Sequence, residues 1–276
     1  MSLSIDLEGR VFLLCGAARG GIPGATARRL AAAGATVAAV DQSQDLLDPT
    51  RADVEAAGGR FHGIVANLMD PGQSDPLVEA VVGRFGRLDG VANVAGGTKA
   101  EEWIPLEETS TAMFRDTLNL NLEYVFRICR DAAAWMIKHD APGSLVNVGS
   151  VSSIAAAPFH GPYGAAKSGI AALTRTMAFE WGKYGIRANT VQPGAVATDR
   201  VMNRPATPHA GASLAGAGSS SIVWTTPDEL ANAIVFLLSD LASGISGQTI
   251  SVDSGLSTKF CAGARPFEIN KRNPQV

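Results

Sequence analysis

The chain contains few of the features that mark disulfide-rich, metal-binding or nucleic-acid-binding proteins. Its three cysteines, Cys15, Cys129 and Cys261, show no C-x-x-C or other metal-ligand spacing, so we expect neither a disulfide framework nor a metal site. The 23 lysines and arginines form no cluster and are outnumbered by 26 acidic residues, which argues against a nucleic-acid partner. No apolar run reaches the ~18 residues of a membrane-spanning helix, so no membrane partner is expected.

The N-terminal sequence also lacks the basic stretch and the apolar stretch of a secretory signal. We therefore expect a cytoplasmic protein, in a reducing compartment. A chain of 276 residues can bury most of its apolar surface without disulfides or metals. A small molecule is then the expected partner.

Short apolar runs alternate with amphipathic segments along most of the sequence, which predicts an α/β fold. We expect one doubly wound Rossmann domain over residues 1–276, with its core at about 7–255 and helices on both faces of a parallel sheet of about seven strands. Two long helices are predicted at about Thr109–Lys138 and Tyr163–Trp181. The predicted strands are Val11–Cys15, Thr36–Val40, Arg60–Ala66, Leu88–Val94, Ser144–Val148, Ile186–Val191 and Gln248–Val252.

Two segments fall outside this alternation. Residues 199–226 are rich in Ala, Gly, Ser and Pro, which predicts a mobile loop on the substrate side. Residues 256–276 form an irregular tail, which we interpret as an extension docked on the surface. Disorder is the alternative for both segments.

A glycine-rich turn follows the first predicted strand and leads into a helix. Its candidate cofactor-binding residues are Gly16, Arg19, Gly20, Gly21 and Ile22. Backbone N–H groups in such a turn can approach a pyrophosphate, whose charge is favoured at the positive end of the helix. A tight turn without a ligand is the alternative interpretation.

Asp41 ends the second predicted strand, 21 residues after Gly20. A carboxylate at this place can accept hydrogen bonds from the adenosine ribose hydroxyls and would repel a 2′-phosphate, which favours NAD as the cofactor. The alternative is that Asp41 only caps the next turn. Arg19 favours NADP instead, because a cation in the glycine turn could meet the 2′-phosphate.

Further candidate cofactor contacts follow the third and fourth predicted strands. They are Asn67, Leu68, Asn93, Ala95 and Gly96. A polar side chain just past a strand can bond an adenine edge, and small residues leave room for a flat ring against the backbone. Turn chemistry is the alternative at each position.

Tyr163 and Lys167 are four residues apart in a predicted helix, so both lie on one helical face. A nearby ammonium favours phenolate, which suits a tyrosine for proton transfer. Ser150 ends the fifth predicted strand, at the sheet edge where this fold places ligands. Asn121 is an amide among apolar residues of a helix. Without the serine, an exposed Tyr–Lys pair is the simpler interpretation.

Together these residues resemble the short-chain dehydrogenase/reductase family over roughly residues 7 to 255. Departures from the family pattern are Cys15 in place of Thr, Pro23 in place of the last Gly of a turn that is one residue longer, and Asn67 in place of Asp. The positions that match the family's motifs, in order, are Gly16–Gly24, Asp41, Asn93–Gly96, Asn121, Ser150, Tyr163 with Lys167, and Pro193 with Gly194.

The resemblance implies hydride transfer between a substrate carbon and a nicotinamide. Tyr163 would then exchange a proton with the substrate oxygen, and Ser150 would orient that oxygen. Lys167 would hold the nicotinamide ribose and lower the pKa of the tyrosine. Asn121 would hold a water that passes protons from the lysine to solvent. Pro193, Gly194, Val196 and Thr198 would line the cofactor, with Val196 and Thr198 at the carboxamide.

The expected substrate contacts are Ser150, Ser152, His160 and Tyr163. The surrounding residues are mostly small or apolar, with no obvious arginine clamp for a carboxylate or phosphate. We therefore expect a neutral, fairly hydrophobic secondary alcohol or ketone. His160 could contact the substrate or only fill space.

The leading hypothesis is an NAD-dependent alcohol dehydrogenase or ketoreductase. The alternatives are an NADP-dependent ketoreductase and a dinucleotide-binding scaffold without turnover. We also expect a homotetramer or homodimer, because both long helices carry apolar residues on more than one face. These residues are Tyr124, Phe126, Ile128, Trp135, Met136, Leu173, Met177, Phe179 and Trp181.

Overall fold

Parallel strands form a single seven-stranded sheet in the order β3-β2-β1-β4-β5-β6-β7. The computed structural model describes residues 4–203 and 224–258. All six strand pairs are parallel, which confirms the predicted doubly wound sheet. The strands are β1 (Val11–Cys15), β2 (Thr36–Asp41), β3 (Arg60–Val65), β4 (Gly90–Asn93), β5 (Gly143–Val148), β6 (Ile186–Pro193) and β7 (Thr249–Val252).

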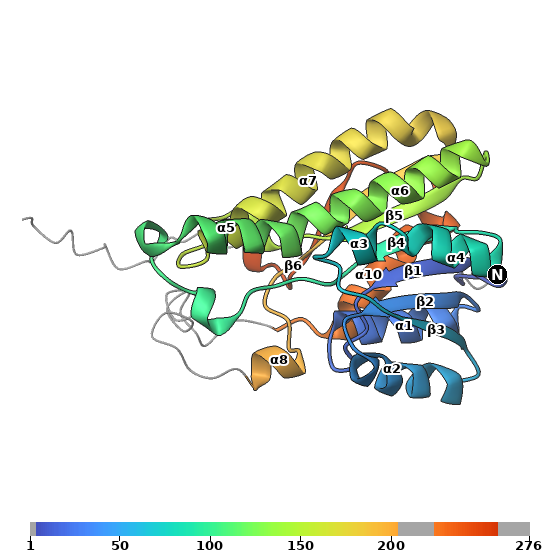
Figure 1. Cartoon of the computed structure of the whole chain (residues 1–276), viewed down its shortest axis with the longest axis horizontal. Coiled ribbons are helices and arrows are strands. Elements are labelled where there is room, and N and C mark those ends of the chain that lie inside the picture. The colour runs from blue at the N-terminus through green and yellow to red at the C-terminus, as the bar shows by residue number, and fades with distance from the viewer. Residues whose placement is uncertain (1–3, 204–223, 259–276) are drawn as a thin grey trace, which may run out of the picture.

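Helices cover both faces of the sheet (Figure 1). The helices α1, α2 and α10 pack on one face, and α4, α6 and α7 pack on the other. The longest pair, α6 and α7, run side by side (Figure 1). The helix bounds are α1 (Ile22–Ala32), α2 (Gln44–Ala56), α3 (Pro71–Ser74), α4 (Leu77–Phe85), α5 (Thr111–Leu118), α6 (Tyr124–Lys138), α7 (Gly161–Trp181), α8 (Asp199–Met202) and α10 (Pro227–Leu238).

The two-residue period of a strand divides the core between these faces. Phe12 and Leu14 of β1 belong to the cluster under α1, α2 and α10, whereas Leu13 and Cys15 belong to the cluster under α4, α6 and α7. Every residue of β1 is buried. This explains why the central strands read as unbroken apolar runs.

The chain reverses its winding at β1, which pairs with β2 on one side and β4 on the other. The crossover from β1 to β2 runs through α1 on one face, and the crossover from β4 to β5 runs through α6 on the other. Connections that diverge in this way open a crevice at the carboxyl ends of the strands. The candidate site residues come from the segments that border this crevice.

The predicted helix at Thr109–Lys138 is interrupted. A π-helical turn at Asn119–Glu123 separates α5 from α6 and contains Asn121. Apolar periodicity did not indicate this turn, because Leu118, Leu120 and Leu122 make the segment apolar on more than one face. The helix α7 begins at Gly161, two residues before the predicted start, with Pro162 in its first turn, where a missing N–H has no helical partner.

Cys15 and Cys129 are buried free thiols, and Cys261 lies outside the described residues. Within residues 4–203 and 224–258, no group of acidic, histidine or cysteine side chains could hold a metal ion. None of the helices in these same ranges has the length and apolar character needed to cross a membrane. Of the two segments set apart in the sequence, residues 204–223 and 259–276 are outside the described part.

Two glycines provide a matched test of how the sheet is packed. In α4, Gly83 has open space around the position of an added methyl, so Gly83→Ala should stabilise the fold by about 0.5–1 kcal/mol through helix propensity. In β4, an added methyl on Gly90 would lie 2.4 Å from the Ser144 carbonyl oxygen, so Gly90→Ala should destabilise by about 1–3 kcal/mol or more. Denaturant midpoints at constant m-value measure both. Equal effects of the two substitutions would contradict this account of β4.

Candidate active site

Four predicted catalytic residues lie at the carboxyl edge of the sheet, near the glycine pair Gly96–Gly97 that follows β4. An added methyl on Gly96 would lie 2.7 Å from Asn121 Oδ1 and 3.4 Å from Lys167 Nζ. Gly96 and Gly97 have φ values of +143° and +120°, which side chains rarely allow. The two glycines therefore let the Asn121 amide and the Lys167 amine, both predicted to be catalytic, approach one stretch of backbone.

Lys167 is buried on α7, with 3% of its surface exposed. Its Nζ donates a hydrogen bond to the Val148 carbonyl at 2.9 Å and lies 5.5 Å from the centre of the Tyr163 ring. Burial lowers the pKa of Lys167 to about 7. The structure thus holds an amine beside the tyrosine that can exchange a proton near neutral pH.

Tyr163 neighbours the Ser150 side chain. Burial raises the pKa of Tyr163, while the Ser150 hydroxyl and the charge of Arg200 act in the opposite direction. The expected lowering of this pKa by Lys167 stays a prediction.

Ser150 lies directly after β5 and is 8% exposed. Its hydroxyl accepts a hydrogen bond from the Ser152 N–H at 3.1 Å and donates one to the Ser152 hydroxyl at 3.2 Å. These contacts fix the hydroxyl at the end of the strand, within reach of Tyr163. Ser152, a predicted substrate contact, therefore also positions Ser150.

Asn121 is fully buried in the π-helical turn. Its Oδ1 accepts from the Gly97 N–H at 2.8 Å, and its Nδ2 donates to the Gly97 carbonyl at 3.0 Å and to the Thr117 carbonyl at 3.0 Å. The Asn121 amide thus both accepts a hydrogen bond from the Gly97 backbone and donates one to it. In this structure Asn121 holds the loop in place, and its expected water-holding role stays a prediction.

The glycine turn presents backbone donors at the start of α1. Among the described residues, no acceptor takes the N–H of Gly20 or Ile22. An added methyl on Gly24 would lie 2.5 Å from the Arg19 carbonyl oxygen, so the turn can close only on a glycine. Pro23 packs against Gly16, with its Cγ 3.1 Å from a methyl added there. Gly24 therefore makes the close approach to the Arg19 backbone that Pro23 cannot make. The N–H groups of Gly20 and Ile22 fit a pyrophosphate.

Asp41 lies at the end of β2, directly beside the glycine turn. Its Oδ2 accepts from the Ala17 N–H at 2.7 Å and its Oδ1 from the Gln42 N–H at 2.8 Å. A carboxylate offers about four acceptor sites, so two remain for ribose hydroxyls. The turn-capping and ribose-binding interpretations of Asp41 are thus compatible.

The Arg19 guanidinium is already engaged in an ion pair. Its guanidinium forms an ion pair with Asp53 of α2, with a shortest distance of 2.8 Å, and Arg28 lies 3.5 Å from the same carboxylate. The Arg19 side chain remains 62% exposed. A 2′-phosphate would have to compete with Asp53 for it.

The polar residues predicted after the third and fourth strands differ in their placement. Asn67 is exposed, and its Oδ1 accepts from the Met69 N–H at 3.0 Å. The Asn93 side chain is buried inside β4 and donates to Asn147 Oδ1 at 2.9 Å. This side chain faces the core beside Cys129, so the predicted cofactor contact at Asn93 stays a prediction, one that only its backbone could meet. Leu68 is buried, and its carbonyl accepts from Arg127.

Ala95 and the residues after β6 complete the border of the crevice. The Ala95 carbonyl accepts from the Tyr124 hydroxyl at 2.7 Å. A methyl on Gly194, which follows Pro193, would lie 2.7 Å from Asp253 Cβ, so the backbones meet closely there. Val196 bridges to Thr225, and the Thr198 hydroxyl accepts from the Val201 N–H at 3.2 Å, capping α8.

An aromatic wall stands beside the tyrosine. The His160 ring stacks on Trp103 at 4.1 Å and lies 5.8 Å from the Tyr163 ring. Trp103 donates to the Thr98 hydroxyl at 2.9 Å. Sequence reasoning missed Trp103, because its loop carries no periodic signal.

Arg200 lies in the loop predicted on the substrate side, 199–226, but was not itself predicted as a contact. From the first turn of α8, its guanidinium donates to the Gly96 carbonyl at 3.4 Å and to the Thr98 carbonyl. An arginine therefore borders the candidate site, although the sequence showed no obvious arginine clamp.

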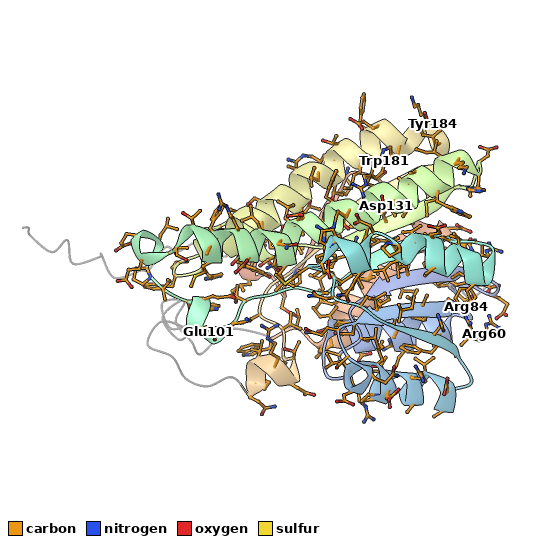
Figure 2. The ribbon with its side chains drawn as sticks, in the orientation of Figure 1. Arg60, Arg84, Glu101, Asp131, Trp181 and Tyr184 are labelled. Carbon is orange, nitrogen blue, oxygen red and sulfur yellow. The ribbon has the colours of Figure 1, made fainter. Side chains whose placement is uncertain are left out.

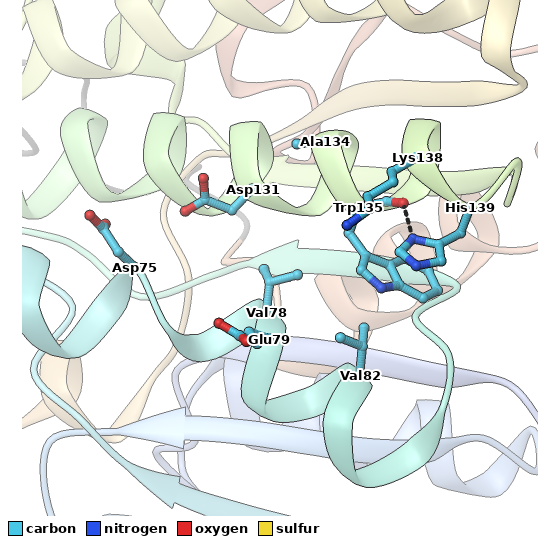
Figure 3. Close-up of a pocket in the computed structure, with 9 residues that line it drawn as sticks. All are labelled: Asp75, Val78, Glu79, Val82, Asp131, Ala134, Trp135, Lys138 and His139. Carbon is cyan, nitrogen blue, oxygen red and sulfur yellow. Dashed lines mark hydrogen bonds between the residues drawn. The ribbon is translucent and has the colours of Figure 1, made fainter.

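A hollow of about 440 Å³ lies on the surface elsewhere, between α4 and α6 (Figure 3). The His139 ring stacks on Trp135 there at 4.6 Å and bonds the Trp135 carbonyl (Figure 3). None of the predicted catalytic residues lines it. The lining residues are Asp75, Val78, Glu79, Val82, Asp131, Ala134, Trp135, Lys138 and His139.

Comparisons with known proteins agree with this geometry. The family model described as "Enoyl-(Acyl carrier protein) reductase" matches residues 16–257. The chain is 36% identical to 3-oxoacyl-[acyl-carrier-protein] reductase FabG of Thermotoga maritima, over 91% of this chain and 98% of the relative. It is 34% identical to levodione reductase of Leifsonia aquatica, over 91% and 95%.

Solved structures show the same fold. A short-chain type dehydrogenase/reductase from Mycobacterium ulcerans superposes with a TM-score of 0.82 and 29% identity, over 92% of both chains. The family model and the relatives above cover nearly the whole described core, including the glycine turn, Ser150, Tyr163 and Lys167. The chain belongs to the short-chain dehydrogenase/reductase family of oxidoreductases.

Proposed function

We propose that the protein is an NAD-dependent oxidoreductase that interconverts a secondary alcohol and the corresponding ketone. The observation that carries this proposal is the adjacent pair of Ser150 and Tyr163, with the buried amine of Lys167 beside the tyrosine ring. The pair lies at the same sheet edge as the glycine turn and Asp41. Neither the charge nor the size of the substrate is fixed by this pair.

The nicotinamide, when bound, supplies or accepts the hydride. Tyr163 gives a proton to the substrate oxygen during reduction and takes it during oxidation. Ser150 orients that oxygen by a hydrogen bond, and Lys167, buried at the bottom of the site, relays the proton and holds the nicotinamide ribose. The Asn121 amide keeps the Gly97 backbone in register with these groups.

The preference for NAD over NADP rests on the balance of two charges. Asp41 places a carboxylate at the end of β2, where a 2′-phosphate would be repelled. Arg19 is the residue that supports the NADP-dependent alternative, but it is paired with Asp53. The third alternative, a scaffold without turnover, is disfavoured because Ser150, Tyr163, Lys167 and Asn121 are all present in contact-forming positions.

Cellular location and assembly belong to the same proposal. The two buried free thiols, Cys15 and Cys129, suit a reducing compartment such as the cytoplasm. We propose a homotetramer or homodimer built on α6 and α7, because Phe126 and Phe179 expose 42% and 90% of their surface. Figure 2 shows Trp181 and Tyr184 together at one end of the molecule. By contrast, Tyr124, Ile128, Met136 and Met177 are core residues, so the apolar outer face is smaller than predicted.

Replacing Asp41 should narrow the preference for NAD(H). A coupling of about 1–3 kcal/mol between the carboxylate and the 2′-phosphate corresponds to roughly 5- to 150-fold in kcat/KM. Asp41→Ala should lose most of this ratio, measured by absorbance of the reduced nicotinamide. Asp41→Asn, which keeps an acceptor for the Ala17 N–H, separates the loss of charge from the loss of the hydrogen bond. Equal or better kinetics of the wild type with NADPH would refute NAD specificity.

Tyr163→Phe should lose nearly all turnover and still bind NADH, because it removes one hydroxyl and leaves the ring packing. Lys167→Ala should weaken both turnover and NADH binding, since the amine serves both. Fluorescence titration of NADH and initial rates measure the two effects. If Tyr163→Phe keeps more than about a tenth of the activity, the proton donor must be assigned to another group.

Light scattering at micromolar concentration should give a mass of two or four chains, because Phe126 and Phe179 need cover. Phe179→Asp should shift the mass toward one chain. Leu241→Asp, which changes an exposed apolar residue outside α6 and α7, should not. A wild-type mass near 28.6 kDa would rule the oligomer out.

A further inference from the structure

We propose that Arg200 binds an anionic group of the substrate, a carboxylate or a phosphate, beside the carbonyl that reacts at Tyr163. This inference rests on the proposed function and replaces the expectation of a neutral substrate. It stands on where the guanidinium lies and on its lack of a carboxylate partner among the described residues.

The guanidinium lies against the loop after β4. It donates to the carbonyls of Gly96 and Thr98, and its Nη1 lies 3.0 Å from a methyl added to Gly97. The same loop is contacted by Asn121, which is bonded to Gly97, and by Lys167, which lies near Gly96. Arg200 therefore adds a second cation to a site that already contains a buried amine.

Thr98 connects Arg200 to the wall of the substrate side. Its carbonyl accepts from Arg200, and its hydroxyl accepts from Trp103. Trp103 stacks on His160, whose ring neighbours Tyr163. A group that meets Arg200 would thus lie along the same wall as the reacting oxygen. The glycine turn, in contrast, is contacted by the preceding residue, since the Asp199 N–H donates to the Gly20 carbonyl at 3.2 Å.

Arg200 lacks the partner that most such cations have. Five N–H bonds extend from a guanidinium, and the two loop carbonyls use two of them. Across residues 4–203 and 224–258, no carboxylate lies within ion-pair distance of Arg200, whereas Arg10, Arg19, Arg60, Arg87 and Arg127 all have one. The remaining donors suit the oxygens of an anion.

The charge of Arg200 also acts on the Tyr163 hydroxyl, where it favours the phenolate. The other charged or titratable groups around this hydroxyl are Lys167 and His160, together with the uncharged Ser150.

The test compares each oxo acid with its own methyl ester, so that the ketone stays the same and only the charge changes. Acetoacetate, levulinate and one longer homologue, each against its ester, are reduced with NADH. At the best chain length the wild type should prefer the acid by about tenfold or more in kcat/KM. Rising ionic strength should shrink this preference.

Variants assign the preference to Arg200. Arg200→Met should bring the acid-to-ester ratio close to one, and Arg200→Lys should restore part of it, since lysine keeps the charge but loses the planar fork. Arg84→Met removes one exposed positive charge on α4 (Figure 2) and should keep the wild-type ratio. An equal ratio in the Arg200→Met and wild-type enzymes overturns the inference.

The remaining outcomes separate the sources of the anion and the two proposals. If Arg200→Met weakens NADH binding and keeps the acid-to-ester ratio, the anion is the pyrophosphate of the cofactor, and the substrate inference fails. Turnover of esters without preference for any acid also overturns the inference and leaves the proposed function standing. NADH binding without turnover of any pair overturns the inference, and failure to bind NADH overturns the proposed function itself.

Discussion

The pairing of β1 with β4 is the contact on which the site depends. At its carboxyl end the Cys15 carbonyl accepts from the N–H groups of both Val94 and Ala95, at 3.1 and 2.7 Å. These bonds join the half of the sheet that carries the glycine turn to the half that carries Ser150 and Tyr163. Because β1 and β4 lead to helices on opposite faces, the backbone parts directly beyond this pairing. The cofactor side and the proton-transfer side of the crevice are therefore fixed relative to one another by two backbone hydrogen bonds.

Electrostatics at the other end of the crevice are governed by burial. Lys167 has a single hydrogen bond to the protein, at the Val148 carbonyl, and its pKa falls to about 7 because water is excluded. The same exclusion raises the pKa of Tyr163. Burial thus moves the two pKa values apart, so near neutral pH the phenol keeps its proton while the amine can gain or lose one. Arg200 adds a further positive charge that acts on Tyr163.

The strands could be predicted because each one is a short apolar run, and β1 was predicted to the residue. Ser150, Tyr163 and Lys167 could be predicted because spacing places them on one edge and one helix face. The π-helical turn could not, since leucines on more than one face of this segment hide the shift that one extra residue makes. Asn93 was assigned to the cofactor because a sequence shows that a residue ends a strand but not which face its side chain takes. Arg200 was missed because its contacts are with backbone carbonyls about 100 residues earlier in the chain.

The π-helical turn breaks the regular helix and at the same time positions Asn121. Its five residues, Asn119–Glu123, interrupt what would otherwise be one regular helix. Deleting one of them would restore the regular hydrogen-bond ladder and rotate the preceding side chains by about 100° relative to α6. Asn121 would then leave the Gly97 backbone. The deletion would also break the hydrogen bonds of Asn121, so any effort to stabilise this protein must keep the length of the segment between α5 and α6 unchanged.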